Sequence, residues 1–277
     1  MPVLIDGHVH VHSSFSLNLF LESAWKNFSS GAERLKLSGD CVYVLALAEG
    51  QRADVFGQMK KIASADSGGS DYSSEAGREF AFFRTREEQS LVARRGEQVL
   101  VIVAGRQILS REGLEVLSLA SLFRVDDHLL PLAELTQTVI DRGGVAVVPW
   151  GVGKWWGKRG RIVAETLSLD RPLLYGGDNG NRPAFWPRPR IFPRPQQPGK
   201  NILSGSDPLP LTGHQARGGC FGSAITDGSL SLDCPAKDLR TLLGREKNRL
   251  IGYGRGASVG RFISDQFRVN LKKRLSR

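Results

Sequence analysis

Three histidines follow one short apolar run near the start of the chain, and they are the first candidates for chemistry. The run ends in Asp6-Gly7-His8-Val9-His10-Val11-His12. Alternate side chains of a strand point to the same face, so Asp6 and the three histidines share one face. Neutral imidazole is a common metal ligand, and a neighbouring carboxylate can fix its tautomer or bind the metal itself. The spacing predicts a metal or catalytic site, with a row of polar side chains on a solvated strand edge as the alternative.

Two carboxylates at later strand ends could complete such a site. Glu49 follows the apolar run 42–48, and Asp207 follows the short run 202–204 between glycine and proline turn formers. In parallel α/β folds, chemistry gathers at the carboxyl ends of the strands. Both positions therefore fit a metal ligand or a general base. The alternatives are a glutamate at the start of a helix and an aspartate that initiates a turn before proline.

Two glycine-rich segments, 150–161 and 176–183, carry further candidates. Their glycines allow the backbone to approach a ligand closely, and their cations and amides can hold an anion. The candidate substrate-binding residues are Trp150, Lys154, Arg159, Asn179, Asn181 and Arg182. The candidate catalytic residues are Asp178, in the second segment, and His214, in the later loop 212–219, where the alternative is an exposed histidine. The alternative for 150–161 is a loop with solvated cations and packed tryptophans, and the alternative for 176–183 is a turn.

The elements that must position these residues alternate between short apolar runs and longer segments of helical periodicity. The predicted strands are 3–10, 41–48, 80–84, 99–104, 145–148, 173–175, 202–204 and 223–226. The predicted helices are 17–35, 55–65, 86–95, 132–142, 161–167, 236–243 and 259–274. This alternation predicts a barrel-like α/β fold, with a doubly wound sheet as the alternative.

Two stretches break the alternation. Residues 64–77 are polar and rich in glycine and serine, which predicts a loop. Residues 182–199 hold six of the 13 prolines, interspersed with arginines, and this composition predicts an extended loop over one rim. Because we interpret it as an insertion rather than a linker, we expect a single domain over 1–277. The last predicted helix, 259–277, is basic. We expect it to pack on the fold, and the alternative is a helix that binds a membrane surface or nucleic acid.

Positive charge is concentrated in the second half of the chain. The 277 residues carry 38 Lys and Arg against 28 Asp and Glu, a net charge of +10. Residues 1–150 hold 15 basic and 19 acidic side chains, and residues 151–277 hold 23 and 9. This asymmetry favours an anionic small-molecule substrate, bound by the basic loops.

Cysteine usage and hydropathy limit the class of protein. The three cysteines form no CxxC pair, which argues against a disulfide framework and a cysteine-built zinc site. No apolar run approaches the ~20 residues that a membrane span needs. The sequence therefore predicts a soluble, cytoplasmic protein without a membrane span.

The motifs, in their order, resemble those of the polymerase-and-histidinol-phosphatase (PHP) superfamily. The segments that carry the resemblance are 6–10, Glu49, 104–107, 142–149 and 205–207. The resemblance covers nearly the whole chain and implies a distorted (β/α)7 barrel similar to the TIM barrel. It also implies a metal cluster at the carboxyl ends of the strands that hydrolyses phosphoesters.

The chain departs from the family's pattern at several ligand positions. Ala48-Glu49 replaces Asp-His, Gln107 replaces a glutamate, and Pro149-Trp150 replaces His-Pro. Leu209 stands where a late histidine is usual, and His214 is the candidate to replace it. The resemblance thus implies fewer than three divalent ions of zinc, manganese or iron, or none. The ligands left to hold them are His8, His10, Glu49 and Asp207.

Three functions are consistent with these residues. The first is a metal-dependent hydrolase of a phosphoester or another anionic small molecule. In this hydrolase, Lys154, Arg159 and Arg182 bind the anionic group of the substrate. The second is a catalytically degenerate PHP-like binding or scaffold module. The third is nucleic-acid processing, which the basic half leaves open although no recognised binding motif supports it. Convergence of the two histidines and Asp207 within metal-ligand distance would favour the first. Their separation, or hydrogen bonds that bridge them to protein groups, would favour the second.

Overall fold

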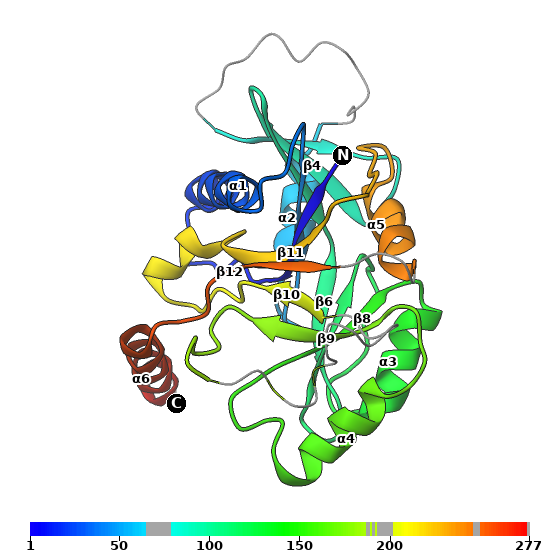
Figure 1. The fold of residues 1–277 in the computed structure, drawn as a ribbon, viewed down its shortest axis with the longest axis vertical. Coiled ribbons are helices and arrows are strands. Elements are labelled where there is room, and N and C mark those ends of the chain that lie inside the picture. Colours follow the sequence, from blue (N-terminus) through cyan, green and yellow to red (C-terminus); the bar gives the residue numbers. More distant parts are fainter. Residues whose placement is uncertain (65–78, 187–188, 190–191, 193–201, 246–249, 276–277) are drawn as a thin grey trace.

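The computed structural model describes residues 1–64, 79–186, 189, 192, 202–245 and 250–275 (Figure 1). Its strands form two sheets of seven and five strands. The predicted loop 64–77 lies outside the described residues except for Ser64, and most of the proline-rich stretch beyond Trp186 does so too. No helix among the described residues is long and apolar enough to cross a membrane.

The first sheet places the strand that carries His8 in its interior, with neighbours on both sides. Its order is β12-β11-β1-β2-β5-β4-β3, and β1 (Val3–Val9) pairs parallel with β2 (Val42–Leu47) and antiparallel with β11 (Phe221–Ile225). The remaining members are β3 (Ala81–Arg84), β4 (Ser90–Arg95), β5 (Gln98–Val103) and β12 (Ile251–Gly254). Every residue of β1 is buried, including the polar Asp6 and His8.

The second sheet has the order β10-β9-β8-β7-β6. Its strands are β6 (Gly105–Leu109), β7 (Glu115–Leu119), β8 (Val145–Pro149), β9 (Leu174–Asn179) and β10 (Ile202–Gly205). Strands β8, β9 and β10 run parallel, so their carboxyl ends lie at one edge. The predicted site segments 150–161, 176–183 and 205–207 lie at these ends.

The helices are α1 (Leu17–Arg34), α2 (Val55–Ile62), α3 (Leu132–Asp141), α4 (Gly157–Leu167), α5 (Pro235–Gly244) and α6 (Val259–Leu275), with the short 3-10 helix η1 (Thr212–Arg217). Helices α1 and α2 pack on the outer face of the first sheet and α3 and α4 on that of the second, whereas α5 contributes to the apolar layer between the sheets. In Figure 1, α3 and α4 lie together beside the five-stranded sheet, and α6 lies apart from them. Apolar side chains of α1 and α2 share one buried cluster with the outer face of the first sheet.

Strand alternation explains how the core joins the two sheets. Val3 and Ile5 of β1 share a buried cluster with Val145 and Val147 of β8. Leu4, between them in sequence, packs on the other side in the cluster that includes α1. The two sheets therefore pack against each other through a common apolar layer. The single domain over 1–277 stays a prediction.

The prediction of a (β/α)7 barrel is wrong. Neither sheet closes into a barrel, and both mix parallel with antiparallel pairs. The cause lies in residues 81–119, where five successive strands, β3 to β7, follow one another without a helix. Residues 86–95, predicted to be a helix, contain β4, which forms a hairpin with β5 at Gly96, whose φ of 55° suits glycine. Hairpins thus replace the strand-helix-strand units that a barrel requires.

Candidate metal centre

His8, His10 and Asp207 bring three ligand atoms to one point. The Nε2 atoms of the two imidazoles lie 3.1 Å apart. The Oδ1 atom of Asp207 lies 3.7 Å from His8 Nε2 and 3.5 Å from His10 Nε2. In the described part of the chain, this is the group of three whose ligand atoms all lie within 4.8 Å of one another. The geometry unites His8 of β1, His10 directly after β1 and Asp207 from the loop after β10.

Two glycines permit this approach of β1 to β10. A Cβ on Gly205 would lie 2.3 Å from the backbone nitrogen of His8, and a Cβ on Gly7 would lie 2.7 Å from Leu203 Cγ. Both distances are shorter than side-chain carbons tolerate, so only glycine fits without movement of the neighbouring strand. Close packing of the two strands then carries Asp207, two residues beyond Gly205, to the histidines.

Asp207 is held in an uncommon backbone conformation. Its φ is 47°, in the left-handed region, and its backbone N–H donates to the carbonyl oxygen of His8 at 2.8 Å. Such conformations cost free energy for a residue other than glycine and cluster at functional sites. The side chain is anchored as well, because Asn179 Nδ2 donates to Asp207 Oδ2 at 2.6 Å. The carboxylate is therefore oriented before any ligand binds.

The protonation states of this group suit metal binding. Burial acts to raise the pKa of Asp207, but His8, His10 and the amide of Asn179 outweigh burial and lower the pKa to about 2. Burial, reinforced by the charge of His8, lowers the pKa of His10 to about 4. At neutral pH the site thus presents a carboxylate anion and a neutral His10 imidazole, which are the forms that bind metal ions.

The donor set fits a divalent ion of the zinc, manganese or iron type. In a tetrahedral zinc site with bonds of about 2.0–2.1 Å, neighbouring ligand atoms lie ~3.3–3.4 Å apart. The three distances in this group, 3.1, 3.5 and 3.7 Å, lie around that value. Gln107 adds an amide oxygen, since its Oε1 lies 3.4 Å from His8 Nε2. Two imidazoles and one carboxylate also leave coordination positions for water and substrate.

Asp6 and His12 share the strand face but point to other partners. Asp6 accepts hydrogen bonds from the backbone nitrogens of Ser206 and Gly219, both at 2.8 Å, and from the Ser206 hydroxyl. Burial raises its pKa to about 6 in spite of these bonds. His12 Nε2 lies 2.8 Å from the carbonyl oxygen of Pro208. Both residues fasten β1 to the segment that carries Asp207.

Glu49 lies outside the candidate metal-binding group, which consists of His8, His10 and Asp207. Its carboxylate instead contacts the start of helix α2. Its Oε1 accepts the backbone N–H groups of Val55, at 2.5 Å, and Phe56, at 3.0 Å. Its Oε2 lies 3.6 Å from Arg106 Nη1. An anion at the N-terminus of a helix satisfies donors that have no partner within the helix. This arrangement gives Glu49 the helix-start role that the sequence left open.

A polar relay connects the metal-binding group to Lys154. Gln107, whose amide oxygen faces His8, donates from Nε2 to Glu115 Oε1 at 3.3 Å. Lys154 Nζ contacts the same oxygen of Glu115. Lys154 is therefore paired with a carboxylate of β7 and reaches the site through Glu115 and Gln107.

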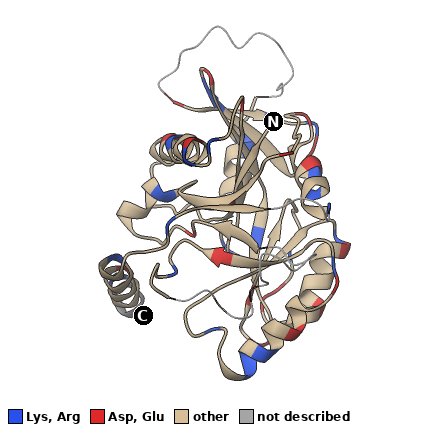
Figure 2. Cartoon of the chain, in the orientation of Figure 1, with Lys and Arg blue, Asp and Glu red and all other residues tan. Residues whose placement is uncertain are grey.

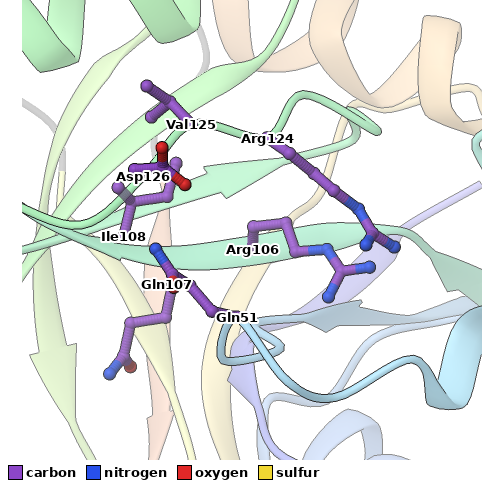
Figure 3. A pocket seen from close by; sticks show the side chains of 7 residues that line it. All are labelled: Gln51, Arg106, Gln107, Ile108, Arg124, Val125 and Asp126. Atoms are coloured by element: carbon purple, nitrogen blue, oxygen red, sulfur yellow. The ribbon is translucent and has the colours of Figure 1, made fainter.

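A cavity of about 420 Å³ adjoins Gln107 (Figure 3). It is lined by Gln51, Arg106, Gln107, Ile108, Arg124, Val125 and Asp126. In Figure 3 the side chains of Arg106 and Arg124 extend toward one end of it. Both guanidinium groups contact Asp54 Oδ1, at 3.3 and 3.1 Å. The cavity has the size of a small-molecule pocket, and it borders a residue that also contacts His8.

Of the predicted substrate-binding residues, all within the described part of the chain, only the two asparagines contact the group directly. Asn179 and Asn181 hold the side chain and the backbone carbonyl of Asp207. Arg159 donates to the carbonyl oxygen of Gly153 at 3.2 Å, and Trp150 is buried against Trp186. None of them belongs to the described lining of the cavity.

The two predicted catalytic residues are each paired within the protein. Asp178 accepts a bidentate pair from Arg182, with Nε to Oδ1 at 2.7 Å and Nη2 to Oδ2 at 2.9 Å. His214 Nε2 lies 3.0 Å from Asp265 Oδ2 of α6, and its Nδ1 accepts the N–H of Leu209 at 3.0 Å. Burial lowers the pKa of His214. In these positions Asp178 and His214 fix loops, and their catalytic role stays a prediction.

Sequence reasoning singled out Gln107 as a departure but missed the cavity beside it. Arg106, Arg124 and Asp54 come from β6, the loop after β7 and the start of α2, so no local motif joins them. The one available signal was the pair Arg106-Gln107 at the strand position where the resemblance implies a ligand.

Comparisons with known proteins add similarity at the level of structure. No family model matches the sequence, and no curated protein matches it. PsfC from Pseudomonas syringae PB-5123 is similar with 15% identity over 98% of this chain and 99% of PsfC, at a TM-score of 0.48. The lesion-specific endonuclease PfuEndoQ from Pyrococcus furiosus is similar with 11% identity over 92% of this chain and 59% of the endonuclease, also at 0.48. The chain thus spans less than two thirds of the endonuclease.

Proposed function

We propose that this chain is a metal-dependent hydrolase of PHP type that acts on a phosphoester or another anionic small molecule. The observation that carries the proposal is the convergence of His8, His10 and Asp207. The sequence segments that resemble the PHP superfamily supply all three ligands. The replaced positions favour one ion over a cluster, because Glu49 is engaged by α2 and Gln107 offers an amide.

The residues divide into three roles. His8, His10 and Asp207 hold the ion, and Asn179 positions the carboxylate. A divalent ion bound there lowers the pKa of water and polarises a phosphoryl oxygen. Arg106 and Arg124 bind the substrate's anionic group at the cavity, where Asp54 now pairs with both. Gln107 borders both the cavity and His8, so it orients the substrate relative to the ion.

The test combines metal content with hydrolysis. The protein, purified without chelator, should carry about one equivalent of zinc, manganese or iron and hydrolyse p-nitrophenyl phosphate. Asp207→Asn and His10→Ala should lose both properties. His128→Ala is the matched control, because His128 lies apart from the group and contacts the carbonyl oxygen of Ser110.

Two results would overturn the proposal. One is protein that binds none of these metals, and the other is hydrolysis that Asp207→Asn leaves unchanged. Metal binding without hydrolysis of any phosphoester tested would favour the degenerate binding module instead.

A further inference from the structure

Exposed aromatic rings form a ladder on the loops that follow β8 and β9. Trp156 and Trp186 are stacked, with ring centroids 6.1 Å apart and planes at 28°. The ring centroid of Phe185 lies 6.4 Å from that of Trp186. The ring of Trp150 contacts Trp186 edge-on, with centroids 6.3 Å apart. Trp156 and Phe185 are each 63% exposed. Large aromatic side chains that gather at a surface mark a binding site more often than a fold requirement.

Positive charge borders the aromatic ladder, Trp156-Trp186-Phe185. Lys158, Arg159 and Arg161 follow Trp156 in the first turns of α4, and all three are exposed. Figure 2 shows this end of α4 in blue. Within the ranges that the structure describes, none of the three forms an ion pair. The cations are thus available to an anionic ligand.

The ladder is tied to the segment that positions the metal-binding group. Arg182 bonds both carboxylate oxygens of Asp178, and its Nη1 donates to the carbonyl oxygen of Trp186 at 2.9 Å. The next residue of β9, Asn179, holds the carboxylate of Asp207. The residues from Asp178 to Trp186 therefore link one ladder ring to one metal ligand through direct hydrogen bonds.

From this arrangement we infer that the ladder and the cations of α4 bind single-stranded nucleic acid, with bases stacked on Trp156 and phosphates on Lys158 and Arg161. Stacked rings next to cations suit this ligand, because every base has a π-face and every linkage carries a negative charge. An uncharged sugar or an apolar protein partner would offer no negative charge to the cations. The inference rests on the proposed function in that the bound strand supplies the phosphodiester for the metal centre.

The first experiment measures binding by fluorescence anisotropy of a labelled single-stranded oligothymidylate with the full chain. Trp156→Ala should weaken binding about tenfold, equivalent to ~1.4 kcal/mol, and Trp156→Phe should restore part of it. Phe267→Ala is the matched control, since Phe267 is an aromatic residue of α6 that is 68% exposed outside the ladder.

The second experiment measures the salt dependence of the same binding. Lys158→Gln and Arg161→Gln should each reduce the slope of log K against log[salt] by about one. Lys61→Gln, an exposed lysine of α2, should leave the slope unchanged. Binding to duplex DNA should be weaker, because paired bases cannot stack on the ladder.

Each outcome separates this inference from the proposed function. Absence of oligonucleotide binding at low salt, or an equal loss in Phe267→Ala, overturns the nucleic-acid inference even where p-nitrophenyl phosphate hydrolysis persists. Preferred binding to anionic lipid vesicles overturns it too. Asp207→Asn protein should still bind the oligonucleotide, so binding without metal or hydrolysis would reject the proposed function alone.

Discussion

The amide of Asn179 donates to the carboxylate of Asp207 at 2.6 Å, so β9 positions a candidate metal ligand that lies beyond β10. The two strands are parallel neighbours, with Asn179 paired to Gly205 in register. The amide hydrogen bond also helps to keep the carboxylate ionised, because it acts to lower the pKa of Asp207. Asn179 is therefore a positioning residue in the proposed site.

Asn179→Ala is expected to weaken metal binding by ~10–100-fold, the usual cost of losing a group that orients a ligand. Titration with Zn²⁺ or Mn²⁺ monitored by calorimetry measures the change. Gln137→Ala is the control, since that amide bonds Asp141 on α3 and lies outside the site. Equal affinities for Asn179→Ala and wild type would show that the hydrogen bond does not orient the carboxylate.

Gly205→Ala tests whether the close approach of β1 and β10 is required. Its Cβ would lie 2.3 Å from the His8 nitrogen, so a strand must move, at a cost of about 1–3 kcal/mol in the free energy of unfolding. Urea denaturation measures it. Gly213→Ala is the control, because a Cβ there meets nothing within 4 Å. Unchanged stability and metal affinity in Gly205→Ala would contradict the packing account.

The predicted ligands that converge in the structure were identified from local patterns. The apolar run and period-two spacing identify β1 and place His8 and His10 on one face. The turn formers around Asp207 mark the end of β10. The predicted fold class is wrong between 81 and 119, because residues 86–95 carry charged and helix-compatible side chains although 90–95 form a hairpin strand. Hairpin pairing there is decided by the partner strand β5 rather than by the segment itself.

The roles of the two acidic residues show a second limit. Asp6 bonds Ser206 and Gly219, about two hundred positions away in sequence, and no local spacing signals such contacts. Glu49 is fixed by helix donors, which was the alternative left open at that position, and by Arg106, which no local pattern signalled. Tertiary contacts therefore decide which carboxylate joins the candidate ligands and which is structural.

Asp6→Asn should remove a specific pH dependence of stability. Burial raises the folded-state pKa of Asp6 to about 6 from 3.8, so between about pH 4 and 6 the native protein holds a proton that the unfolded chain has released. This contribution to stability is present below about pH 4 and is lost as pH rises through 6. The stability of wild type relative to Asp6→Asn should fall over that window and stay constant above it.

Urea denaturation of the two proteins at a series of pH values measures this difference. The lost hydrogen bonds give an offset that does not vary with pH, so the slope alone reports the titration. A relative stability that rises with pH below 4 would mean that the hydrogen bonds from Ser206 and Gly219 outweigh burial.

Gln107→Glu should convert the amide beside His8 into a further metal ligand. Gln107 Oε1 lies 3.4 Å from His8 Nε2, so a carboxylate there would add a negative oxygen to the metal-binding group. The same carboxylate would face Glu115, which now accepts from Gln107 Nε2 at 3.3 Å, and like charges would oppose the gain.

The double variant Gln107→Glu with Glu115→Gln removes that repulsion. Metal affinity should therefore rise more in the double variant than in the single one, as calorimetric titration with Mn²⁺ or Zn²⁺ measures. Glu115→Gln alone is the control, and an affinity that Gln107→Glu leaves unchanged in both backgrounds would place Gln107 outside the ligand sphere.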